Sequence, residues 1–90
     1  MEKIIIVNKT NSFYSDILKN KFKINFEIVN YYLNENLNKS EKTILKEINS
    51  QIKKKNINYL VAEGDYLSLI NFNFIQKINC NKKILFLTDD

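Results

Sequence analysis

The chain has 90 residues, a formal net charge of +4 and a hydrophobic content of 44%. This length allows one small domain with a thin core. It has no histidine and one cysteine, so catalytic triads, histidine metal sites and internal disulfides are excluded. One glycine excludes glycine-rich phosphate-binding loops, and no segment reaches the roughly 20 apolar residues that span a membrane. We therefore expect a cytoplasmic protein.

The basic charge comes from lysine alone, in a sequence that is also rich in asparagine and isoleucine. Such a joint bias places lysine wherever a solvated residue is needed, so we interpret the lysines as ordinary surface. A net positive charge would suit an anionic partner. Nucleic acid is nevertheless not the partner that we expect.

The first half of the chain is predicted to alternate strands with a helix. Residues 4–7 form a β-branched run without polar alternation, which predicts a strand covered on both faces. Asn11 or Ser12 can cap a helix that ends near Phe22. Residues 24–28 alternate strictly, as an edge strand does.

The clearest helix of the sequence comes next, after a predicted polar loop at residues 34–39. Ser40 is its expected N-cap, and lysines at residues 53–55 favour the negative end of its dipole. Its apolar stripe consists of Ile44, Leu45, Ile48 and Ile52.

The last third of the chain is predicted to hold two strands and one helix. A strand at residues 57–62 is followed by a turn at residues 63–65. A third helix begins near residues 66–68 and ends at Ile78, and residues 84–87 form the last strand.

Strands that alternate with helices predict parallel pairing through right-handed crossovers. We therefore expect a single α/β domain over residues 1–90, built as a small three-layer sandwich. Its centre is a four-stranded, mostly parallel sheet, and three helices cover it. Ligands of such sheets gather beyond the carboxyl ends of the strands, so the residues that follow the strands are the candidate site.

Four carboxylates follow the predicted strands. Glu63 and Asp65 come after the third strand, and Asp89 and Asp90 come after the fourth. Carboxylate oxygens are the ligands that Mg²⁺ prefers, so these residues are the candidate metal ligands. Ordinary turn and capping chemistry explains them equally, and Asp65 is well placed to cap the third helix. We favour that second interpretation and predict no catalytic residue and no cofactor.

Three segments, at residues 3–8, 57–63 and 83–88, together resemble a response-regulator receiver domain, which has a flavodoxin-like fold. The resemblance implies the strand order 2-1-3-4. It also places Thr88 at the position of that family's switch residue, and Glu63 where the family has its phosphorylated Asp.

The chain departs from the receiver pattern at several points. Asn8 and Lys9 stand where the family has the paired acids that hold Mg²⁺. The family's fifth strand, its lysine and the last helix have no counterpart here. The resemblance thus implies a degenerate, truncated receiver that acts as a non-catalytic protein-interaction module.

Two alternatives stay open. Residues 61–65 and 87–90 resemble the Toprim fold of primases and some nucleases, which implies a Mg²⁺-dependent phosphoryl-transfer or nuclease domain. The other alternative is a small stand-alone binder or inhibitor of a host enzyme, of the kind that mobile elements carry. Such a protein needs only a fold and a surface.

The last strand is the segment for which we predict a partner. In the order 2-1-3-4 it lies at the edge of the sheet, yet residues 84–87 are apolar on both alternating faces. An apolar edge strand with free backbone groups is a template for pairing with another chain. We predict a homodimer or a complex with a protein partner, built on Lys83, Ile84, Leu85, Phe86, Leu87 and Thr88.

Overall fold

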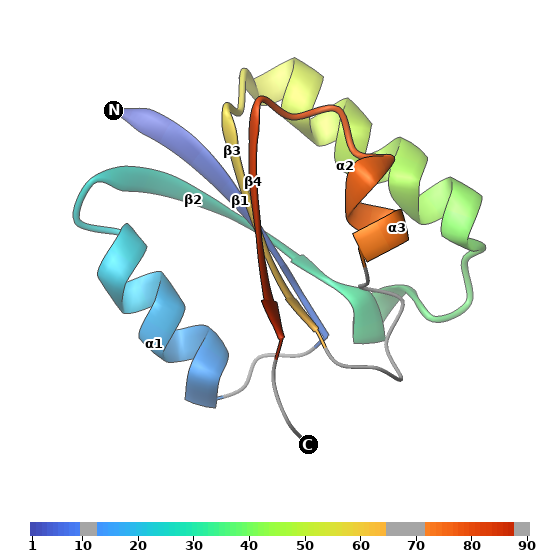
Figure 1. Ribbon diagram of the computed structural model, residues 1–90, viewed down its shortest axis with the longest axis horizontal. Coiled ribbons are helices and arrows are strands. Elements are labelled where there is room, and N and C mark those ends of the chain that lie inside the picture. The colour runs from blue at the N-terminus through green and yellow to red at the C-terminus, as the bar shows by residue number, and fades with distance from the viewer. Residues whose placement is uncertain (10–12, 65–71, 88–90) are drawn as a thin grey trace.

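The computed structural model describes residues 1–9, 13–64 and 72–87, in which strands and helices alternate (Figure 1). The elements in chain order are β1 (Glu2–Asn8), α1 (Phe13–Phe22), β2 (Phe26–Tyr32), the 3₁₀ helix η1 (Leu33–Asn36), α2 (Glu41–Lys55), β3 (Tyr59–Gly64), α3 (Phe72–Gln76) and β4 (Lys82–Leu87). This succession confirms the predicted α/β class.

The four strands form one parallel sheet in the order β2-β1-β3-β4. β1 pairs with β2 along its whole length and with β3 on its other side, where Ile4 lies opposite Tyr59. β3 in turn pairs with β4, and Val61 lies opposite Ile84. The predicted strand order 2-1-3-4 is therefore confirmed, with β1 and β3 inside the sheet and β2 and β4 at its edges.

The helices cover the two faces of the sheet unequally. Figure 1 shows α2 and α3 on one face and α1 on the other. We call these the α2–α3 face and the α1 face. Because successive side chains of a strand point to opposite faces, every strand contributes to both. Ile5 and Leu60 point to the α2–α3 face, and their neighbours Ile4 and Val61 point to the α1 face.

The two faces have separate cores. On the α2–α3 face the buried cluster consists of Ile5, Val7, Leu33, Ile44, Ile48, Ile52, Ile57, Leu60, Ala62, Phe74, Ile75 and Ile78. On the α1 face the described members of the buried cluster are Ile4, Ile6 and Val61, with Phe22, Phe26, Ile28 and Tyr59 packed partly buried against it.

Helix α2 begins and ends where its sequence predicts. The Ser40 hydroxyl accepts a hydrogen bond from the Thr43 amide at 3.2 Å, which caps the first turn. At the other end Asn56 adopts a left-handed conformation, with φ 54° and ψ 49°, and donates its amide to the Ile52 carbonyl. The predicted stripe faces the sheet, since Ile44, Ile48 and Ile52 are buried.

Strands β2 and β3 lie further along the chain than predicted. β2 was expected at residues 24–28 but runs to Tyr32, because β1 supplies pairing partners along its full length. β3 was expected at residues 57–62 but begins at Tyr59. Ile57 is instead bonded through its amide to the Ile52 carbonyl at 3.0 Å, as part of the end of α2. Glu63 consequently belongs to β3 and not to the turn after it.

Other boundaries also differ. β1 is longer than the predicted residues 4–7, since it extends from Glu2 to Asn8. β4 begins at Lys82, before the predicted residues 84–87, and α3 ends at Gln76 and not at Ile78. The predicted loop at residues 34–39 contains most of η1, whose Leu33 is buried in the α2–α3 core. The third helix is described as α3 from Phe72, and its predicted start at residues 66–68 lies outside the described residues.

Candidate functional site

Two polar side chains meet at the carboxyl edge of the sheet. The register that pairs Val7 with Ala62 makes Asn8 and Glu63 neighbours, at the ends of β1 and β3. From β1 the next strand in the chain lies toward one edge of the sheet, and from β3 it lies toward the other edge. Parallel sheets hold ligands between two such strands. Asn8 is 0% exposed and Glu63 is 8% exposed, and they are the buried polar side chains among the described residues.

The Asn8 amide is buried without hydrogen bonds. Neither its Nδ2 nor its Oδ1 has a partner. A buried polar group in this condition costs about 1–3 kcal/mol of folding free energy. From the sequence, Asn8 was interpreted as a residue that departs from the receiver pattern. Its position directly after the apolar run of β1 is the signal that it continues a buried strand.

The other three candidate carboxylates are not among the described residues. Asp65, Asp89 and Asp90 lie outside the described residues, as does Thr88. Within residues 1–9, 13–64 and 72–87 no group of three or more acidic or cysteine side chains is arranged to hold a metal ion. Of the four predicted metal ligands only Glu63 is placed, and the Mg²⁺ site stays a prediction.

Strand β4 carries the predicted interaction edge. It pairs with β3 on one side and is the outermost strand of the sheet. Leu85 packs partly buried against the α2–α3 core, whereas Ile84 points to the α1 face and is 50% exposed. The Lys83 ammonium donates to the carbonyls of Ile75 and Gln76, at 3.3 and 3.4 Å, which ties β4 to the end of α3.

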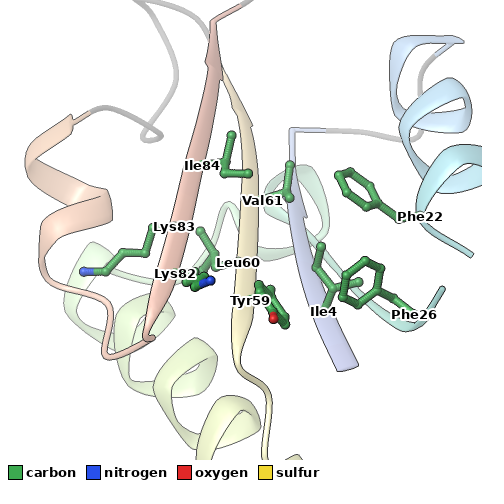
Figure 2. Close-up of a pocket in the computed structure, with 9 residues that line it drawn as sticks. All are labelled: Ile4, Phe22, Phe26, Tyr59, Leu60, Val61, Lys82, Lys83 and Ile84. Carbon is green, nitrogen blue, oxygen red and sulfur yellow. The ribbon is translucent and has the colours of Figure 1, made fainter. Parts of the chain in front are cut away.

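An apolar groove of about 490 Å³ lies on the α1 face beside β4. Figure 2 shows its side chains coming from α1 and from all four strands. The residues that define it are Ile4, Phe22, Phe26, Tyr59, Val61 and Ile84. This groove was not predicted from the sequence. The packing position of α1 decides which strand positions it covers, and the sequence does not give that position.

Aromatic rings make one wall of the groove. Phe22 and Phe26 contact edge to face, with centroids 5.9 Å apart, and Phe26 and Tyr59 do the same at 5.2 Å. The Lys82 ammonium lies 5.7 Å from the centroid of the Tyr59 ring. A hydrogen bond to Glu2 raises the pKa of Tyr59.

A second polar cluster joins β2, η1 and α2. The Glu47 carboxylate accepts the Tyr31 hydroxyl at 3.0 Å and pairs with the Lys39 ammonium at 2.8 Å. Hydrogen bonds from Lys39 and Tyr31 lower the pKa of Glu47, and burial and the same carboxylate raise the pKa of Tyr31. Each group is satisfied by another in the cluster, so the cluster holds β2 and α2 together.

Cys80 is the single cysteine of the chain. It is half-buried in the segment before β4, and burial raises the pKa of its thiol. The thiol donates weakly to the Lys82 carbonyl, with a distance of 3.7 Å between sulfur and oxygen.

No protein-family model, curated protein or solved structure matches the chain. Among its described residues, no helix has the length and apolar character needed to traverse a lipid bilayer.

Proposed function

We propose that the chain is a non-catalytic protein-interaction module, receiver-like in its strand order, that acts through β4. The observation that carries this proposal is the position of β4 at the edge of the sheet, with apolar residues at 84–87. The outer side of an edge strand presents backbone N–H and C=O groups, and another chain can pair with these groups by adding a strand.

The opposite edge supports this choice. β2 carries exposed polar side chains at Glu27 and Asn30, which disfavour edge-to-edge association. β4 has lysines only at its beginning, Lys82 and Lys83, and the four positions after them are apolar. One edge is thus protected by polar residues, whereas most of the other has the composition of a strand that is covered. A second copy of the chain or a different protein would cover it.

The test uses the chemistry of Cys80, which lies two residues before the start of β4. Residues 1–79 as a thioester and residues 80–90 as a synthetic peptide join by ligation at this cysteine. N-methylation at Ile84 or at Leu85 then removes one backbone donor. Consecutive N–H groups of a strand point to opposite sides, so one variant weakens pairing with β3 and the other blocks the free edge.

We expect the variant that blocks the free edge to keep the melting temperature of the unmodified chain and to lose its complex. Sedimentation velocity at micromolar concentration measures a homodimer. A photo-cross-linking residue at Lys83, with one at Lys46 on the exposed surface of α2 as control, captures a different partner in cells. A monomer that captures no protein from position 83, or a complex that survives both N-methylations, contradicts the proposal.

A further inference from the structure

Part of the α1 face has no covering helix among the described residues. Packed helices lie about 8–10 Å apart and neighbouring strands about 4.8 Å apart, so one helix covers about two strands. The α2–α3 face follows this rule, with two helices over four strands. On the α1 face α1 contacts β2, and the groove opens beside it over β3 and β4.

The groove lies over the first halves of β3 and β4, and the strands themselves have the length of a short helix. β3 and β4 have six residues each, which corresponds to strands about 20 Å long. A helix of roughly 13 residues spans the same distance. A helix laid there would bury Ile84, which is now half exposed, and would contact Tyr59 and Phe22 on the facing wall.

The charge of the groove indicates the chemistry of that helix. Lys82 and Lys83 line it, and no acidic residue does so within the described part of the chain. Figure 2 shows the Lys83 side chain directed away from Phe22 and Phe26, so Lys82 is the cation on the groove side. Two copies packed groove to groove would bring their Lys82 ammonium groups together, which disfavours a second copy as the occupant.

We propose that this groove binds an amphipathic helix of a protein partner, whose apolar stripe contacts Ile84 and whose acidic side chains lie beside Lys82. The inference rests on the proposed function and adds to it the kind of element that the partner supplies. Helices that bind in grooves anchor through apolar residues at i, i+3, i+4 and i+7, and flanking charges select among them.

The probe is a displayed library of 14-residue helices with a fixed leucine stripe and randomised flanking positions, selected on the intact chain. We expect enrichment of Asp and Glu at the flanks. Ile84→Glu should weaken the selected helix roughly ten-fold or more. The control Ile24→Glu, at a 72% exposed isoleucine outside the groove, should leave the affinity unchanged. Circular dichroism verifies that both variants fold.

A charge exchange makes the test specific. Lys82→Glu should weaken the binding of the acidic helix. A helix with Lys at the same flanking positions should then bind to this variant instead. Enrichment of no helix, equal binding of acidic and basic flanks, or indifference to Ile84→Glu overturns the inference.

The N-methylated variants separate the two proposals. If N-methylation of the β4 edge abolishes a complex of the chain but no helix binds the groove, only this inference fails. If helices bind as expected and no complex uses β4, the groove stands and the strand-pairing function fails.

Discussion

The two faces of the sheet are built from the same strands, and their described side chains are buried to different extents. Ile5 and Leu60, on the α2–α3 face, belong to a cluster of twelve buried residues, and their neighbours Ile4 and Val61 belong to a cluster of three. Two consecutive residues of β4 show the same difference in burial. Ile84 is half exposed, whereas Leu85 packs against the larger core. Burial in this fold is set by the helices that cover a strand.

The two faces of the sheet differ in what they contribute to stability and to recognition. Among the described side chains, the larger buried cluster lies on the α2–α3 face, and burial of apolar surface stabilises the fold. The α1 face holds the groove, the half-exposed Ile84 and the unpartnered amide of Asn8. Substitutions of buried residues on either face should mainly change the free energy of unfolding. Substitutions at the half-exposed Ile84, beside the groove, should mainly change binding.

The largest effect is expected from the α2–α3 core. Ile48→Ala should lower the free energy of unfolding by roughly 2–4 kcal/mol, because the side chain is fully buried and leaves a cavity. Ile5→Ala and Leu60→Ala should cost a similar amount. Urea denaturation followed by circular dichroism measures the change. A midpoint that stays at the wild-type value for Ile5→Ala would mean that β1 is not the central strand.

A stabilising change is expected at Asn8 on the α1 face. Asn8→Leu replaces an unpartnered buried amide by an apolar group of similar size, so the free energy of unfolding should rise by about 1–2 kcal/mol. Asn30→Leu, at an exposed position of β2, is the matched control and should be nearly neutral. Thermal melts compare the two variants. Destabilisation by Asn8→Leu would instead show that the amide has a partner in solution.

A smaller effect is expected at the open part of the α1 face. Ile84→Ala should cost about 1 kcal/mol or less in the isolated chain, because half of the side chain is already exposed. The same substitution should weaken the groove complex more than it weakens the fold. Paired urea titrations with and without the selected helix measure both. A loss as large as that of Ile48→Ala would mean that the α1 face is packed like the other.

The smallest effect is expected from the Tyr31–Glu47–Lys39 cluster, where Glu47 is partly exposed. The pKa of Glu47 is lowered in the folded chain, so its stabilisation is present above its ordinary value of 4.5 and is lost as the pH falls through the folded pKa. Glu47→Gln should therefore narrow the difference in urea midpoint between pH 7 and pH 3. Equal pH dependence in both proteins would contradict this assignment.

How far the sequence predicted these features depends on whether they are local. The unbroken apolar run at residues 4–7 predicted an interior strand, and all four side chains are buried. Ser40 predicted the start of α2 because a cap is a local interaction. The shift of β3 was missed because Ile57 is apolar like a strand residue but completes the end of α2.

The candidate site was predicted less well than the fold. Glu63 was expected after β3, and it lies at the carboxyl end of that strand beside Asn8. The burial of the Asn8 amide contradicts ordinary residue preference, and its position directly after the apolar run of β1 is the signal that indicates it. The groove was missed because Ile84 and Leu85 are equivalent in an apolar run, and only the packing of α1 distinguishes them.

The parallel sheet also sets an order of events during folding. β1 acquires its second neighbour only when β3 has formed, because Ile4 pairs with Tyr59 across more than half of the chain. Every strand pair encloses a helix, so no hairpin can nucleate the sheet, and such topologies fold slowly. During synthesis β1 is therefore itself an unpaired edge until β3 emerges. We expect early folding of this chain to depend on α1 and β2, the elements that reach β1 first.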